Sequence, residues 1–336
     1  MAVVLLALGL VAGALPASAS HTGRKPAPHT WRAVTHFSKP RFVAKQKVDV
    51  RTAGAFWRAW QSISPGEEID VHGVTFRGEA VFAKRLPGWA EVHFDAGTRF
   101  AGTPGSNLPA TWINGCRHIR FYGGTLTNPA GGTGITIYDS SYFTWWGFAI
   151  HDTANTGLIV QGIHAPNNHL DLEGSISHWG RNLALDPHSE KGTGLHGANL
   201  GDAVYGVKNS RFVLSLHDAA IGSGVEAGGA RSSDGFWRNT LYLRCRNLGK
   251  RAVRLTAGNC LQVWGYNVFG NDFAYIEAEK LQGRPYEASG MFGGQSLASN
   301  RVGYGRAFRT NLNPAVGRIR WDPGNGTVFA NIAPRP

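Results

Sequence analysis

Short segments that open with a small residue and continue as alternating apolar and polar residues recur in this chain from residue 134 onward. They begin at Gly134, Gly157, Gly194, Gly224, Ala252 and Gly290, at intervals of 23 to 38 residues. A repeat with variable insertions is typical of a solenoid, in which each repeat buries its apolar face only against its neighbours. The spacing therefore predicts stacked β-rungs rather than a compact α/β domain.

A second recurring residue lies at a constant distance from the first. Asn209, Asn239 and Asn267 each follow a segment start by 15 residues, and each precedes another apolar segment that could form a strand. Asn and Gly both tolerate the left-handed backbone conformation that sharp corners need, and stacked Asn side chains can hydrogen-bond from rung to rung. We expect at least two strands per rung, with Gly or Asn at the corners.

Composition supports an all-β chain. Of 336 residues, 45 are Gly and only 17% are charged, which argues against a helical bundle or a coiled coil. The glycines have no three-residue period, so collagen is excluded. A hydrophobic content of 42%, with 11 Trp and 17 Phe, excludes wholesale disorder.

The two ends of the chain differ from the repeats. Residues 1–19 read as a secretory signal peptide, because an apolar stretch precedes the small-residue pattern at 17–19. Residues 20–48 resemble a flexible linker and 311–336 a tail or cap, which leaves one domain over 49–310. Within it, apolar residues at helical spacing between Thr52 and Ile63 predict a short helix that caps the first rung.

Three cysteines, Cys116, Cys245 and Cys260, suit an exported protein without a disulfide framework. Cys245 and Cys260 could pair, but three free thiols are an equally good interpretation. No spacing of Cys and His matches a zinc site.

The net charge of +12, from 34 basic and 22 acidic residues, is spread along the chain. Without a basic run, this pattern does not predict nucleic-acid binding. A diffuse positive field favours an acidic polymer such as a uronate-containing polysaccharide. We expect a secreted monomer without a membrane span.

The capping stretch Gly66–Gly73 with Gly78, and the rung sequences GLIVQG, NSRFVLS and NTLYLRCRN, resemble those of the right-handed parallel β-helix proteins of the pectate-lyase-like superfamily. The resemblance covers roughly residues 50 to 310. It implies the fold but not one chemistry, because that superfamily includes lyases, hydrolases, epimerases, adhesins and phage tailspikes. The catalytic patterns of polygalacturonases and the calcium-binding aspartates of pectate lyases are not found, so no residue is carried over.

Strand alternation predicts a line of ionisable residues on the outer face. If the segment starts align, the second residue of each strand points outward, and rungs stack about 4.8 Å apart. This alignment places His196, Glu226 and Arg254 in one column, as catalytic candidates.

A second ionisable column is expected where the preceding strands end. It would contain His151, His178, His217, Arg246 and Glu279, with Asp218 directly after His217. We take His217 and Asp218 as catalytic candidates, and assign the remaining basic or acidic positions nearby to substrate binding. These binding positions are His178, Arg246, Lys250 and, in the insertion 181–193, Asp186, His188 and Lys191.

Two cleavage chemistries suit these residues. Eliminative cleavage of a uronate needs a base, a cation beside the carboxylate and a proton donor, for which a histidine and Arg254 would serve. Hydrolysis needs two carboxyl groups, such as Glu226 and an aspartate. We rank a polysaccharide lyase first, a glycoside hydrolase second, and a non-catalytic glycan-binding or adhesin solenoid third. No cofactor is predicted, and a divalent cation such as calcium is left open.

Overall fold

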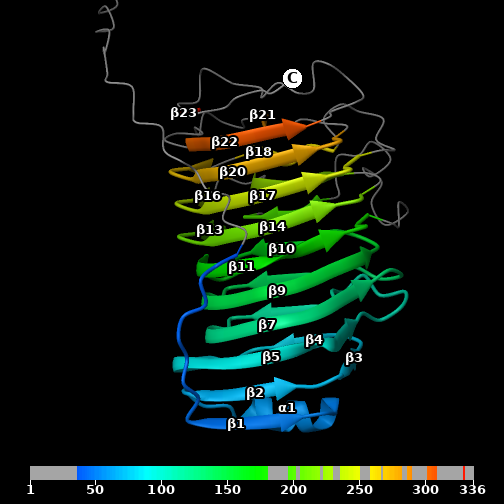
Figure 1. Ribbon diagram of the computed structural model, residues 1–336, viewed down its shortest axis with the longest axis vertical. Helices are drawn as coiled ribbons and strands as arrows, with labels where there is room; N and C mark the ends of the chain where they lie inside the picture. Colours follow the sequence, from blue (N-terminus) through cyan, green and yellow to red (C-terminus); the bar gives the residue numbers. More distant parts are fainter. Residues whose placement is uncertain are drawn as a thin grey trace, which may run out of the picture. The chain divides into compact units, whose positions relative to one another are not determined.

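The computed structural model is a right-handed parallel β-helix (Figure 1). It describes residues 36–180, 196–201, 205–219, 222–229, 235–249, 258–265, 268–281, 286–289, 301–308 and 328–329. All of them belong to one compact unit that spans 31–336. Asp186, His188, Lys191, Lys250 and Arg254 lie outside the described residues.

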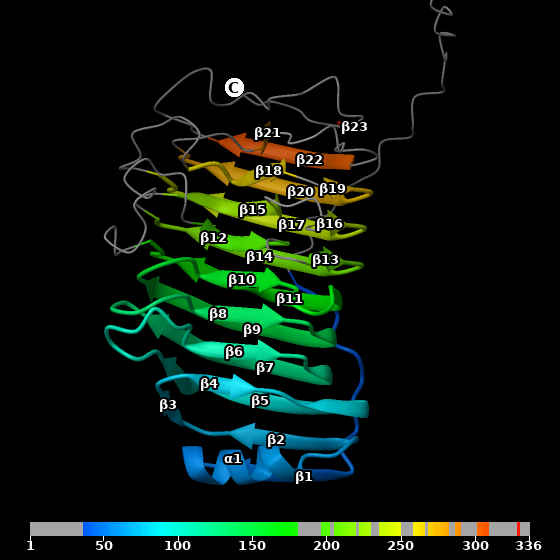
Figure 2. The ribbon, with the colours of Figure 1, turned by 180° about the vertical axis from the view of Figure 1, so that it is seen from behind.

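Two parallel sheets form the sides of the stack, and the described rungs from β2 to β21 contribute to both (Figures 1 and 2). The large sheet contains β1 (Gln46–Val50), β2 (Glu67–Val71), β3 (Thr75–Arg77), β5 (Arg85–Ala101), β7 (Arg117–Asn128), β9 (Ser141–Thr153), β11 (Asn167–Ser177), β13 (Val207–Lys208), β14 (Arg211–His217), β16 (Phe236–Trp237), β17 (Thr240–Arg246), β19 (Val268–Phe269), β20 (Asp272–Glu279), β22 (Arg301–Phe308) and β23 (Val328–Phe329). The small sheet contains β4 (Ala80–Phe82), β6 (Thr111–Asn114), β8 (Ile135–Tyr138), β10 (Leu158–Gln161), β12 (His196–Leu200), β15 (Ser223–Gly229), β18 (Leu261–Gly265) and β21 (Tyr286–Ser289).

Helix α1 (Ala53–Ser62) covers the first rung, as the sequence predicts (Figure 1). Its N-cap is Thr52, whose side chain accepts a hydrogen bond from the Ala55 amide at 3.1 Å. Phe56 packs edge-on against Phe76 at 5.0 Å, and Trp60 packs against Phe121 at 5.7 Å. The helix thereby covers the open end of the stack, where the core consists largely of aromatic side chains.

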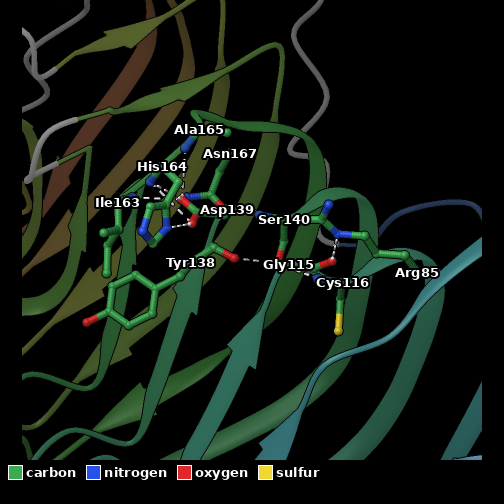
Figure 3. Close-up of polar contacts among 10 residues, drawn as sticks. All are labelled: Arg85, Gly115, Cys116, Tyr138, Asp139, Ser140, Ile163, His164, Ala165 and Asn167. Carbon is green, nitrogen blue, oxygen red and sulfur yellow. Dashed lines mark hydrogen bonds and ion pairs between the residues drawn. The ribbon is translucent and has the colours of Figure 1, made fainter.

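Polar side chains connect the rungs at their corners (Figure 3). Ser140 donates its amide to the Asn167 side chain at 2.9 Å, and its hydroxyl accepts from the Cys116 amide at 3.1 Å. Higher in the stack, Asn239 accepts from the Ser210 amide at 2.9 Å. These bonds satisfy buried backbone groups where the strands end, so they hold each rung in register with the next.

Another corner uses a carboxylate in the same way (Figure 3). Asp139 has a left-handed backbone, with φ of 48°, and it accepts hydrogen bonds from the amides of Ile163, His164 and Ala165 at 2.7 to 3.2 Å. His164 Nδ1 lies 2.9 Å from the same carboxylate. Burial alone would raise the pKa of Asp139, but the bonds from His164 and the neighbouring amides lower it.

Glycines at or next to the starts of the small-sheet strands form a column, and their α-carbons lie close to core side chains. A Cβ on Gly157 would lie 2.4 Å from an Ile176 methyl, and one on Gly197 would lie 2.4 Å from Leu216. In the next rungs the column continues with Gly224 and then with Cys260, because Val225 pairs with Leu261. The small residues are therefore required by close packing at this corner.

This register corrects two of the expected strand starts. Ala198, rather than Leu195, pairs with both Leu158 and Val225, so Gly197 takes the position in β12 that the sequence assigned to Gly194. In the small sheet, the neighbour of β15 is β18, in which Leu261 pairs with Val225, so Leu261 takes the position that the sequence assigned to Val253. The alignment was wrong because Gly194 resembles a strand start and because Cys260 replaces the expected glycine.

Cys245 and Cys260 form a disulfide between β17 and the start of β18, with their Cα atoms 5.5 Å apart. Cys116 is a buried free thiol, and its burial raises its pKa to about 12. Of the two interpretations left open by the sequence, the structure therefore has the paired one.

Residues 36–45, within the predicted linker, form an arm that runs across the strands of the large sheet (Figure 1). The arm is bonded at both ends: His36 Nδ1 lies 2.6 Å from Glu173 of β11, and the Lys45 amide donates to Gly66. The first strand begins at Gln46, shortly before the expected boundary at 49. At the other end, β23 lies within 311–336 and pairs with β22.

Removal of the side-chain amide of one corner asparagine should measurably lower the stability of the β-helix. Asn239→Ala leaves the buried Ser210 amide and the Val207 carbonyl without their side-chain partner, so we expect the free energy of unfolding to fall by about 2 kcal/mol. Denaturant titration measures this. Asn114→Ala, at an exposed strand end, is the matched control, and an equal loss in both variants would contradict the account.

Candidate functional site

Outward-facing residues of the large sheet form straight columns, because each pairs with the equivalent residue of the next rung. One column consists of Ser175, Ser215, Arg244 and Glu277. The next, two residues further along the strands, consists of His151, Ser177, His217, Arg246 and Glu279. The predicted column at the strand ends is thus present, except that Ser177 occupies the place assigned to His178.

His178 instead belongs to a set of residues with left-handed backbone that ends each strand. The φ angles of Asp152, His178, Asp218, Asn247 and Lys280 lie between 54° and 60°. In this conformation the chain turns sharply after each strand of the large sheet. The one-residue shift places His178 beside Asp218 rather than in line with His217.

His217 and Asp218 form a hydrogen-bonded pair at this turn. His217 Nδ1 lies 2.9 Å from the Asp218 carboxylate, whose other oxygen accepts from Asn247 at 2.8 Å. Burial alone would raise the pKa of Asp218, but the bonds from His217 and Asn247 outweigh it and lower that pKa. Both side chains remain accessible, with exposed fractions of 37% and 39%.

These residues line a surface depression of about 530 Å³ at the ends of β14, β17 and β20. Arg244 and Arg246 lie two residues apart on β17, so both guanidinium groups point from the same face. Arg244 Nε lies 3.3 Å from Glu277, and Arg246 Nε lies 3.4 Å from Glu279. The depression therefore combines an imidazole with two guanidinium groups.

Arg244 and Glu277 were not among the sequence candidates. A signal for them was available, since each precedes a predicted column residue, Arg246 or Glu279, by two positions. Residues with that spacing share a face of a strand.

His196 and Glu226, the leading sequence candidates, do meet, but on the small sheet and below its surface. His196 Nε2 lies 2.9 Å from Glu226 Oε2, and Asn199 donates to Oε1 at 3.3 Å. The residues are only 3% and 5% exposed. The pair is therefore a buried contact between adjacent rungs.

The expected straight line through these residues is wrong. His196 pairs with Ser223, whereas Glu226 lies between Asn199 and Gln262. Gln262 thus occupies the position that the sequence alignment assigned to Arg254.

Two groups near the capping helix have the spacing of metal ligands. They are Asp49 with Asp70 and His72, and Glu68 with Glu91 and His93. Lys47 Nζ lies 2.8 Å from Glu68 and 2.6 Å from Asp70, and Arg120 lies 3.0 Å from Glu91. Lys47 and Arg120 thus already pair with three of the four carboxylates, so we assign no metal to either group.

Comparison with known proteins supports the fold. The chain is similar to the crystal structure of pectate lyase Pel9A, with a TM-score of 0.57, 15% identity, and coverage of 87% of this chain and 78% of that one. An alginate lyase from Paenibacillus sp. str. FPU-7 has a TM-score of 0.44 and 13% identity, over 86% of this chain and 100% of that one. Neither a protein-family model nor the sequence of a curated protein matches this chain. Within the described residues, no helix has the length and apolar character needed to cross a membrane.

The buried pair should matter for stability. Glu226→Ala removes the partner of both His196 and Asn199, and we expect the free energy of unfolding to fall by about 3 kcal/mol. Glu279→Ala, which removes an exposed carboxylate from the large sheet, should cost less than about 1 kcal/mol. Denaturant titration of both variants checks this, and a loss at Glu226 no larger than that at Glu279 would show that the buried pair is unimportant.

Proposed function

We propose that this protein is a secreted lyase that cleaves an acidic, uronate-containing polysaccharide in the depression on its large sheet. The observation that carries the proposal is that His217 lies with Arg244 and Arg246 in one accessible hollow. The parallel β-helix similar to that of a pectate lyase adds support, as does the apolar N-terminal stretch with the pattern of a signal peptide.

His217 is the proposed base. Asp218 accepts a hydrogen bond from Nδ1, which favours the tautomer with its proton on that nitrogen and its lone pair on Nε2. The lowered pKa of Asp218 keeps its carboxylate ionised, so the imidazole stays oriented. Nε2 can then take the proton from C5 of the uronate.

Arg244 and Arg246 are the proposed partners of the uronate carboxylate. Their pairs with Glu277 and Glu279 are long and partly exposed, and such pairs contribute little to stability. A substrate carboxylate can replace them, and a guanidinium group binds it through two parallel hydrogen bonds. The net charge of +12 attracts the acidic polymer.

The elimination then balances without another reactant. His217 removes the C5 proton, the guanidinium groups stabilise the negative charge that develops on the carboxylate, and the C4–O4 bond breaks as the C4–C5 double bond forms. The departing O4 keeps the bonding electrons and takes a proton from water, and the imidazolium gives its proton back to the solvent. His217 returns to its neutral form.

We place this chemistry at His217 rather than at His196 and Glu226 because a polymer needs an accessible surface. His196 and Glu226 on the small sheet are almost fully buried. Their side chains already contact each other. The proposed role of this pair is to stabilise the rungs.

A spectroscopic assay tests the proposal. With polygalacturonate or alginate, the full chain should generate the absorbance of unsaturated uronates in step with new reducing ends. His217→Ala and Arg246→Ala should each lower kcat by at least about 100-fold, since each removes a group that acts in the transition state. His164→Ala, at an exposed corner, is the control. New reducing ends without absorbance would indicate hydrolysis and would contradict the proposal.

A further inference from the structure

A second hollow adjoins the depression on the outer face of the large sheet. Its volume is about 310 Å³, at the lower end of the range for small-molecule sites. Most of its wall is apolar, from Phe148, Val213, Leu214, Tyr242, Leu243 and Tyr275. We propose that it is a subsite for one end of the uronate chain and that His36 of the arm closes it; this inference rests on the proposed function.

The two hollows are continuous, because Ser215 and Arg244 line both. Glu277 accepts a hydrogen bond from the Tyr275 hydroxyl at 2.7 Å and another from Arg244 Nε at 3.3 Å. Arg244 therefore lies at the boundary between the two hollows. A sugar in the apolar hollow would have its carboxylate near Arg244 while the next sugar lies in the depression.

The wall suits the face of a sugar ring. Val213, Tyr242 and Tyr275 occupy equivalent positions on β14, β17 and β20, so they form one strip across successive rungs. The ring of Tyr242, which is half-buried, offers a flat apolar face to the C–H groups of a pyranose. The predicted ligand is therefore a hexuronate residue of the polysaccharide.

The arm limits the hollow on the side toward the capping helix. His36 lines it and is held by Glu173, whose second oxygen accepts the Phe37 amide at 2.7 Å. Phe37 lies 6.0 Å from the Trp146 ring and beneath the Arg211 guanidinium. The strip that continues along the sheet is thus covered by the arm and is closed to the polysaccharide.

The arm also limits the direction from which a uronate chain can approach. Phe37 packs against Trp146 and Val213, so it covers the strip beyond His36. The uronate chain should therefore enter from the opposite side with its end against His36. This geometry predicts cleavage near chain ends.

Binding measurements separate this inference from the proposed function. In the His217→Ala protein, which should bind but not cleave, we expect Tyr242→Ala to weaken the binding of oligogalacturonides or oligoalginates by roughly tenfold in titration calorimetry. Tyr142→Ala, at an exposed position on β9, is the matched control and should leave the Kd unchanged. Circular dichroism verifies that each variant is folded.

If the His217→Ala protein binds uronate oligosaccharides and Tyr242→Ala changes nothing, the subsite is wrong while the proposed function stands. If no uronate oligosaccharide binds to the His217→Ala protein, the proposed function fails, and the inference fails with it.

The role of the arm is tested through product size. The parent protein should release short products from the start and lower the viscosity of polygalacturonate or alginate slowly. Phe37→Ala, which loosens the arm, should shift the products toward longer chains. Rapid loss of viscosity with the parent protein would overturn the closure at His36.

Discussion

The parallel register between rungs is the constraint on which the rest of the structure depends. Neighbouring strands lie about 4.8 Å apart, so residues separated by a whole turn of the chain become direct neighbours. Ser177, His217, Arg246 and Glu279 form a column in this way. The corner bonds of Ser140 and Asn239 hold the register, and the inward glycines allow the backbone to pass close to the core.

Much of the fold could be predicted from the sequence, because solenoid repeats, corner residues and the amphipathic capping helix all have local signals. The register of the small sheet could not. Gly194 and Gly197 both resemble a strand start, and the sequence does not show that Gly197 is the one that packs against Leu216. Because the side-chain pattern has a short period, a small error in alignment moves a residue to another column, as happened with His196.

The candidate site, like the register of the small sheet, could be predicted only in part from local sequence patterns. The sequence identified His217, Asp218 and Arg246, but the hollow also depends on Arg244 and Glu277, which local alternation could have added. Burial was harder to foresee. His196 with Glu226 and His217 with Asp218 are both histidine–carboxylate pairs, yet the first is enclosed and the second is accessible. That difference arises from the tertiary environment, and it decides which pair can meet a polymer.

The most direct test of the central claim is a crystal structure of the His217→Ala protein with a uronate oligosaccharide. The account predicts the sugar in the depression, with a carboxylate within hydrogen-bonding distance of Arg244 or Arg246 and C5 facing the position of the missing imidazole. An oligosaccharide bound on the small sheet near Glu226, with the depression empty, would contradict it.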